Sequence, residues 1–260
     1  MNQPNVNHAN AALALADVSK SFGGLNVIRN FSCHIRKGSR SAFIGPNGAG
    51  KSTLFNLISG VYPLDEGSVQ LEGRDITRLP SRKRIAHGLA RNFQNIRLMP
   101  TLSVLENLML GQHCRVRGWG QLLAPVRLRR GTAWHGEIHE ELDRAGLLQY
   151  ASRQISELPY GIRKKLEIVR ALLAKPSVLL LDEPCAGLNS AERAQIIPFL
   201  KSLESRGITL LIVEHDMQFI ADLCEHVVAL NFGQKIAEGT PQQVRMNPEV
   251  IAAYLGSDGA

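Results

Sequence analysis

The sequence predicts an α/β fold with a mostly parallel sheet covered by helices. Three strand-sized apolar segments carry this prediction, namely 41–44, 178–181 and 208–213, and each is followed at once by a glycine or an acidic residue. Such uninterrupted apolar strands are typical of parallel sheets, whose two faces are both buried. Ligands of these sheets bind beyond the carboxyl ends of the strands, so the residues that follow the three segments are candidates for a functional site.

The composition is that of an ordinary soluble protein of 260 residues, with 44% hydrophobic and 20% charged residues. This length suffices for one large domain or two closely joined ones. All apolar runs are much shorter than the roughly eighteen residues that cross a bilayer, so we do not expect the chain to span a membrane. The formal net charge of +7 permits a nucleic-acid partner, but it is more readily explained by a solvated basic surface, attraction to anionic lipid or the binding of nucleotide phosphates.

The cysteines and the N-terminal segment indicate a reducing compartment. Cys33, Cys114, Cys185 and Cys224 lack the spacing of metal ligands, and segment 1–10 has no positively charged leader ahead of a short apolar stretch. We therefore expect free thiols in the cytosol and no signal peptide.

The strongest motif follows the first apolar segment. It consists of Gly45, Pro46, Asn47, Gly48, Ala49, Gly50, Lys51, Ser52 and Thr53, and the apolar residues of 54–58 then fall at helical spacing. Glycines let successive backbone N–H groups turn inward around phosphates, and the helix N-terminus adds partial positive charge. Lys51 is placed to reach the outer phosphates and the Ser52 hydroxyl to bind magnesium. A tight glycine turn alone would require neither side chain, so the loop predicts binding of a nucleoside triphosphate.

Polar residues also follow the other two apolar segments. Asp182 is predicted to hold magnesium, directly or through water, and Glu183 to polarise an attacking water as general base. Two acids after a strand would in isolation indicate a helix cap or a solvated loop, but the phosphate loop at the same sheet edge favours the catalytic interpretation. His215 is placed to contact the terminal phosphate or the attacking water, although a lone histidine at a strand end is more often a surface residue.

These elements, in this order, resemble the nucleotide-binding subunits of ATP-binding cassette (ABC) transporters, from about residue 13 to residue 256. The resemblance implies a P-loop NTPase core with an antiparallel β subdomain and an inserted helical subdomain, and ATP and Mg²⁺ as cofactors. It makes Phe22 the aromatic on which adenine stacks, with an ordinary core phenylalanine as the alternative. It also places Gln94 in the loop that contacts magnesium and links the site to a membrane partner, and makes His215 the switch histidine.

The same resemblance implies the division of the chain. We expect a flexible tail over 1–12, the first part of the ATPase core over 13–94, the helical subdomain over 95–157, the signature helix with the remainder of the core over 158–256, and a tail over 257–260. Within the helical subdomain, periodicity predicts helices over 103–110 and 137–147. The arginine-rich segment 115–130 between them could lie against a membrane subunit or lipid, or form a solvated loop.

Two further stretches correspond to family motifs with substitutions. Leu158, Pro159, Tyr160, Gly161 and Ile162 align with the signature Leu-Ser-Gly-Gly-Gln, which closes over the ATP of a partner in a head-to-tail dimer. Pro159 offers neither a hydroxyl nor an N–H, so one phosphate contact must be absent, whereas the Gly161 N–H remains available and the basic residues 163–165 could add positive charge. We expect a weakened but working site. In the interface loop 186–189, Asn189 stands where most relatives have Asp.

A narrower resemblance concerns bacterial importers of branched-chain amino acids, a branch that also serves urea, amides and aromatic acids. It rests on segments 22–25, 91–98, 184–189, 233–241 and 253–256. It implies an ATPase that powers import at the cytoplasmic face of the bacterial inner membrane. Its expected partners are a second ATP-binding subunit, identical or different, two transmembrane permease subunits and, indirectly, a periplasmic solute-binding protein, but no nucleic acid.

Two other functions are compatible with parts of this pattern. A soluble cassette protein acting on ribosomes or DNA would fit the basic charge, but such proteins usually carry two cassettes or a long coiled-coil insertion, and this sequence has no internal repeat. A P-loop kinase would not explain Gln94, the signature-like stretch and His215 together.

Overall fold

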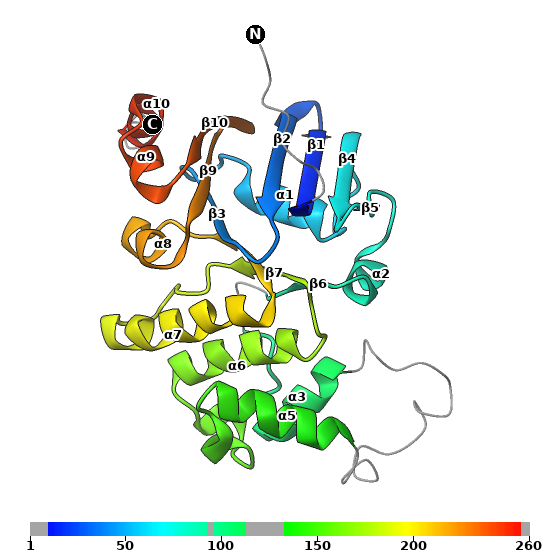
Figure 1. Ribbon diagram of the computed structural model, residues 1–260, viewed down its shortest axis with the longest axis vertical. Helices are drawn as coiled ribbons and strands as arrows, with labels where there is room; N and C mark the ends of the chain where they lie inside the picture. The colour runs from blue at the N-terminus through cyan, green and yellow to red at the C-terminus, as the bar shows by residue number, and fades with distance from the viewer. Residues whose placement is uncertain (1–9, 93–95, 113–132, 256–260) are drawn as a thin grey trace.

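The computed structural model describes residues 10–92, 96–112 and 133–255. Two sheets lie above a layer of helices (Figure 1). The strands are β1 (Ala11–Phe22), β2 (Leu25–Arg36), β3 (Arg40–Ile44), β4 (Glu66–Leu71), β5 (Arg74–Asp75), β6 (Leu89–Arg91), β7 (Val178–Asp182), β8 (Thr209–Val213), β9 (His226–Asn231) and β10 (Gln234–Gly239). The helices are α1 (Lys51–Ile58), α2 (Ser81–Ala86), α3 (Val104–Gly111), α5 (Ala133–Arg144), α6 (Tyr160–Leu172), α7 (Ser190–Ser202), α8 (Met217–Leu223), α9 (Pro241–Arg245) and α10 (Pro248–Leu255), with short 3₁₀ turns η4 (Leu148–Tyr150), η5 (Ile155–Glu157) and η6 (Glu204–Arg206).

The larger sheet is mostly parallel and has the strand order β10-β9-β3-β8-β7-β6. Only β10 runs antiparallel, to β9. Strands β7 and β8 are buried at every residue, which agrees with the apolar runs that predicted them. Val213 at the end of β8 pairs with Phe43 of β3 on one side and with Asp182 of β7 on the other. The loops after these three strands therefore leave the sheet at one edge, as predicted.

The smaller sheet is antiparallel, with the order β2-β1-β4-β5. The ring of Phe43 on β3 meets the ring of Phe31 on β2 and that of Phe55 on α1 edge to face, at 5.7 and 6.2 Å between centroids. One hydrophobic core thus joins both sheets to α1. Strand β1 begins at Ala11, inside the tail expected over 1–12, because Ala12 is fully buried in this core.

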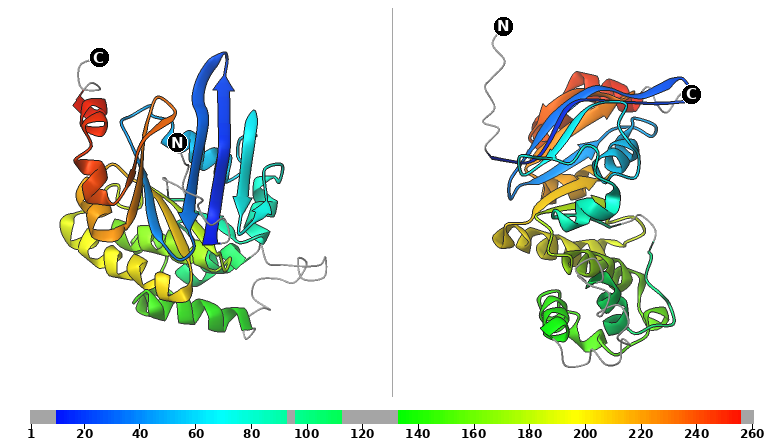
Figure 2. Two further views of the ribbon diagram at one scale, coloured as in Figure 1. Left: turned by 45° about the horizontal axis from the view of Figure 1, so that its top comes forward. Right: turned by 90° about the vertical axis from the view of Figure 1, so that its right-hand side faces the viewer.

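The helices α3, α5, α6 and α7 form the layer below the larger sheet, and Figure 2 shows from the side that α3 and α5 lie farthest from the antiparallel sheet. The two helices predicted over 103–110 and 137–147 correspond to α3 and α5. Ser103 is the N-cap residue of α3, and its hydroxyl forms a capping box with Glu106. The arginine-rich segment 115–130 lies outside the described residues.

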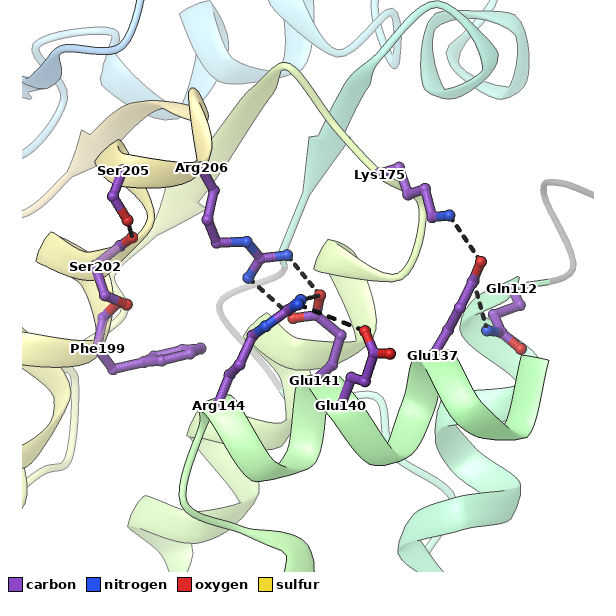
Figure 3. A network of polar contacts seen from close by, with 10 residues as sticks. All are labelled: Gln112, Glu137, Glu140, Glu141, Arg144, Lys175, Phe199, Ser202, Ser205 and Arg206. Atoms are coloured by element: carbon purple, nitrogen blue, oxygen red, sulfur yellow. Dashed lines mark hydrogen bonds and ion pairs between the residues drawn. The ribbon is translucent and has the colours of Figure 1, made fainter. Parts of the chain in front are cut away.

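Ion pairs connect α5 to the amino ends of two parallel strands (Figure 3). Glu141 accepts hydrogen bonds from both terminal nitrogens of Arg206, just before β8, at 2.9 and 2.5 Å, and from Arg144 at 3.1 Å. Lys175, just before β7, donates to Glu137 at 2.7 Å. These ion pairs therefore join the helical layer to the larger sheet at the amino ends of β7 and β8, opposite the edge at which the loops after β3, β7 and β8 leave the sheet.

Two sequence-based expectations concern the chain as a whole. In the part of the chain that the structure describes, no helix is both long and apolar enough to cross a bilayer. The thiols of Cys33, Cys185 and Cys224 are free and buried, as expected, while Cys114 lies outside the described residues.

Candidate nucleotide site

The phosphate loop lies between β3 and α1, where the sequence predicted it. Gly45 and Gly50 have φ angles of 149° and 102°. A Cβ on Gly45 would approach the Leu230 carbonyl oxygen to 2.2 Å, and the φ angle of Gly50 is one that residues with a side chain rarely adopt, so both positions require glycine. Gly50 is the residue before α1, and the first turn of α1 holds no acidic residue. The N-terminus of α1 therefore presents its positive end to the loop, as phosphate binding requires.

Lys51 lies across the phosphate loop. Its Nζ donates to the carbonyl oxygens of Gly45 and Pro46, at 2.6 and 2.9 Å. Burial lowers the pKa of the Lys51 amine, and the Glu183 carboxylate across the site raises it by a smaller amount. Ser52, the next residue, is exposed. The Lys51 amine is therefore within electrostatic reach of the Glu183 carboxylate, and Ser52 beside it is open to solvent.

Asp182 ends β7 with a nearly buried side chain. Its Oδ2 accepts a hydrogen bond from Nη2 of Arg91 at 2.7 Å, and its backbone N–H donates to Oδ1 of Asn92 at 2.7 Å. In the segment around Arg91 and Asn92 the sequence suggested a role at the site only for Gln94, which lies outside the described residues. The two residues that hold Asp182 were therefore missed, although their position just before Gln94 was a signal that could have found them.

Glu183 is one of the few non-glycine residues with a positive φ, 46°. Its N–H donates to the carbonyl oxygen of Val213 at 2.9 Å, and its carbonyl oxygen accepts from Nζ of the buried Lys164 at 3.3 Å. Left-handed backbone at a bulky residue costs energy and is concentrated at functional sites, where the surrounding contacts enforce it. The strain at Glu183 is thus an independent indication of function at the predicted catalytic residue.

His215 lies on the surface at the end of β8, beside the same edge. Its backbone N–H donates to Oε2 of Glu214 at 3.2 Å, and the other oxygen of Glu214 accepts from the N–H of Cys185 at 2.8 Å. Glu214 is only 1% exposed, and burial raises the pKa of its carboxyl group. Glu214 therefore links the loop after β7 to the loop after β8, a role that the sequence did not suggest.

Phe22, at the turn between β1 and β2, is 40% exposed, so the alternative of an ordinary core residue is wrong. Its ring meets the ring of Tyr62 edge to face at 5.2 Å, and the Lys20 ammonium lies 5.3 Å from its centroid. Tyr62 had not been predicted to take part. An exposed aromatic pair is suitable for stacking on a base, and adenine stacking stays a prediction.

The signature-like stretch forms the start of α6. Pro159 is the N-cap residue, Leu158 is buried beneath it, and the hydroxyl of Tyr160 donates to the Ala186 carbonyl oxygen at 3.3 Å. The Gly161 N–H, expected to remain available, instead donates to Oε1 of Glu192 on α7 at 3.2 Å. Ile162 is half-buried against the larger core.

The basic residues that follow turn toward their own chain. Lys164 donates to the Glu183 carbonyl oxygen, and Nζ of Lys165 lies 4.8 Å from the Phe199 centroid. The Arg163 guanidinium lies 5.8 Å from the Tyr160 centroid. Because these three side chains contact residues of their own chain, the contacts do not favour the expectation that they add positive charge to a partner's site.

Asn189, which stands in the interface loop where most relatives have Asp, is the N-cap residue of α7. Its Oδ1 accepts from the Glu192 N–H at 3.0 Å, and its own N–H donates to Oε2 of Glu192 at 3.0 Å. Asn and Asp cap helices about equally well, so the substitution leaves the start of α7 intact.

Comparison with known proteins decides the family. Residues 28–186 match the model of the ABC transporter family. The chain belongs to the ABC transporter family. Residues 234–260 match a second model, described as branched-chain amino acid ATP-binding cassette transporter. The narrower resemblance seen in the sequence is confirmed by this second match.

Curated relatives and solved structures agree with this assignment. The chain is 37% identical over 248 residues to the high-affinity branched-chain amino acid transport ATP-binding protein LivG of Salmonella typhimurium, covering 94% of this chain and 97% of the relative. It is 36% identical to the corresponding protein BraF of Pseudomonas aeruginosa, with the same coverage. The ADP conformation of MJ1267, an ATP-binding cassette of an ABC transporter, superimposes with a TM-score of 0.86 at 31% identity, covering 95% of this chain and 99% of that one. The predicted fold class and the ATP-binding cassette are confirmed.

Proposed function

We propose that the chain is the ATP-hydrolysing subunit of an importer for branched-chain amino acids or a related small solute. The carrying observation is the common edge at which β3, β7 and β8 end, because it gathers the phosphate loop, Asp182, Glu183 and His215. The proposed solute class is supported by the match of residues 234–260 and by the relatives LivG and BraF, both of which are named for branched-chain amino acid transport. Nothing in the nucleotide site selects the solute, so selectivity belongs to other chains.

The residues at this edge are suited to magnesium. Ser52 and Asp182 offer hydroxyl and carboxylate oxygens, the hard ligands that Mg²⁺ prefers. Among the described residues, no group of three or more His, Cys, Asp or Glu side chains could hold a metal alone. This agrees with an ion that keeps waters and shares its coordination with nucleotide phosphates. We therefore assign Ser52 and Asp182 as ligands, and Gln94 as a third, which lies outside the described residues.

Each residue of the nucleotide site then has a chemical role. The loop from Gly45 to Thr53 surrounds the phosphates, and Lys51 exchanges its carbonyl partners for phosphate oxygens. Bound Mg²⁺ would neutralise charge on the phosphates. Glu183 orients the attacking water and accepts its proton, and His215 faces the terminal phosphate from the neighbouring loop.

The proposed assembly contains two such subunits placed head to tail, with the stretch Leu158 to Ile162 of one over the phosphate loop of the other. A dimeric state is supported by the cassette MJ0796, solved as a dimer in a post-hydrolysis state bound to ADP and Pi, which superimposes with a TM-score of 0.73 at 26% identity and covers 88% of this chain. Two permease subunits would anchor the dimer at the cytoplasmic face of the inner membrane, and a periplasmic solute-binding protein would deliver solute to them.

The test is Glu183→Gln in the assembled transporter. We expect the variant to bind ATP normally, to lose ATP turnover and to accumulate an ATP-bound dimer, because the amide fills the same space but accepts no proton. Glu66→Gln, which changes an exposed carboxylate on β4, is the matched control and should hydrolyse ATP normally. Retained hydrolysis by Glu183→Gln would contradict the assignment. The solute is tested by measuring solute-dependent ATP hydrolysis in proteoliposomes that contain the binding protein. If branched-chain amino acids do not stimulate hydrolysis while urea, amides or aromatic acids do, branched-chain amino acids are excluded as the solute.

A further inference from the structure

Arg91 ends β6 beside the nucleotide edge and has a nearly buried side chain, 10% exposed. Its Nη2 donates to Oδ2 of Asp182 at 2.7 Å. Its Nη1 donates to Oδ1 of Asn56 at 2.7 Å and to Oγ of Ser59 at 3.0 Å. The guanidinium carbon lies 5.5 Å from the centroid of the Phe55 ring. Four contacts with described residues thus hold the guanidinium.

Three of these four contacts come from a single helix. Phe55 and Asn56 belong to α1, and Ser59 is its C-cap residue. The N-terminus of α1 forms the phosphate loop, so the element that binds phosphate also fixes the guanidinium. Because the guanidinium is a rigid planar fork, its orientation is set by α1 whether or not Asp182 is engaged. The Asp182 carboxylate, itself 9% exposed, therefore follows Arg91 rather than the reverse.

The neighbouring residue holds Asp182 from a second direction. Oδ1 of Asn92 accepts from the Asp182 backbone N–H at 2.7 Å, and the Asn92 N–H donates to the Leu180 carbonyl oxygen at 3.0 Å. Arg91 and Asn92 thereby hold both the side chain and the main chain of Asp182. A carboxylate accepts at both oxygens, and Arg91 uses Oδ2, so Oδ1 can serve a metal or a metal-bound water.

We propose that Arg91 is a positioning residue for magnesium: it fixes the orientation of the Asp182 carboxylate relative to α1 and offsets its buried charge. This inference rests on the proposed role of Asp182 as a magnesium ligand. Groups that hold a ligating carboxylate in place change metal affinity by about 10- to 100-fold when they are removed. The opposite effect, competition between Arg91 and the metal for Asp182, is disfavoured because the guanidinium keeps Asn56, Ser59 and Phe55 as partners and need not move.

The experiment measures binding of a fluorescent ATP analogue to the purified full chain, once with Mg²⁺ and once with EDTA. The ratio of the two affinities isolates the magnesium contribution and needs no turnover. We expect Arg91→Met to reduce this ratio about 10-fold or more, while binding in EDTA stays unchanged because the phosphate loop is intact. Arg91→Lys keeps the charge, but a single ammonium cannot reach Asp182 and Asn56 as a fork does, so an intermediate reduction is expected.

Two further variants make the outcome decisive. Ser59→Ala removes one contact of Nη1 and leaves the bond to Asp182, so it should keep the wild-type ratio. Asp182→Asn should lose the magnesium contribution, and if it does not, the assignment of Asp182 as a ligand fails rather than the role of Arg91. If Asp182→Asn loses the contribution while Arg91→Met and Arg91→Lys keep the wild-type ratio or exceed it, the positioning role is overturned. Should Arg91→Met bind no nucleotide in EDTA, Arg91→Lys decides alone, and an unchanged ratio in it overturns the proposal.

Discussion

Tyr254 connects the last helix, α10, to the first residue of the phosphate loop, and its replacement by Phe removes a single oxygen atom. The backbone N–H of Gly45 donates to the Tyr254 hydroxyl oxygen at 2.9 Å. Gly45 is buried, and its Cα lies so close to the backbone of Leu230 that a Cβ there would meet the Leu230 carbonyl oxygen. Burial raises the pKa of Tyr254, so the phenol stays protonated at neutral pH and accepts through its lone pairs. Tyr254→Phe leaves the ring packing in place and the Gly45 N–H without this acceptor.

A buried N–H that loses its acceptor costs about 1 to 3 kcal/mol. Taking about 2 kcal/mol, the thermal midpoint of a chain of this size falls by about 4 to 8 °C. Urea unfolding followed by circular dichroism measures the free energy directly, and a thermal scan measures the midpoint. The matched control is Tyr160→Phe, whose exposed hydroxyl donates to the Ala186 carbonyl oxygen at 3.3 Å, and we expect it to change stability by less than about 0.5 kcal/mol. If the two variants are equally stable, the C-terminal helix does not support the phosphate loop through Tyr254.

Two further predictions concern the signature and the response to acid. Pro159 is the N-cap residue of α6 and provides no side-chain cap. Pro159→Ser should therefore stabilise the protein by about 1 kcal/mol and, by restoring a hydroxyl, raise ATP hydrolysis of the assembled transporter. An unchanged or lower rate of hydrolysis would count against a weakened signature. The pKa of Glu238 is lowered from 4.5 to about 2, first by its hydrogen bond with His226 and then by Lys235. A carboxyl whose pKa is lowered in the folded state contributes stability above pH 4.5, and this contribution is lost as the pH falls toward 2. After allowance for partial exposure, Glu238→Gln should lower the free energy of unfolding by about 1 to 2 kcal/mol at pH 7 and by less at pH 3. Urea unfolding at both pH values checks this, and a loss of equal size at both would refute it.

Local sequence was sufficient to predict the site where a single segment contains both the secondary-structure pattern and the residues that do the chemistry. The phosphate loop was predictable because strand, glycines, Lys51 and helix follow one another, and Asp182 and Glu183 because uninterrupted apolar strands imply a common edge. Helix α3 was placed within one residue of its observed bounds. The helix predicted over 137–147 instead ends at Arg144, because Gly146, with a φ of 65°, takes the left-handed conformation that terminates helices.

Contacts between distant segments were not predictable from periodicity or spacing. Arg91 and Asp182 are 91 residues apart, and Gly45 and Tyr254 are 209 apart. Motifs mark residues that meet a ligand, whereas Arg91 and Tyr254 act through contacts with Asp182 and Gly45, and such contacts have no fixed spacing in the sequence. The Gly161 N–H was expected to await a phosphate because the sequence cannot show that Glu192, on the next helix, reaches it.

The bond between Gly161 and Glu192 has a consequence for a lone subunit. A helix N-terminus that presents donors attracts anions from solution. In this chain the carboxylate of Glu192 supplies that anion from within, while its other oxygen accepts from the Asn189 N–H. A nucleotide brought by a second subunit would therefore not fill an empty position but exchange with a resident carboxylate. In the proposed head-to-tail dimer, closure would replace one anion by another at this contact, and its strength there would depend on the difference between the two interactions rather than on the size of either.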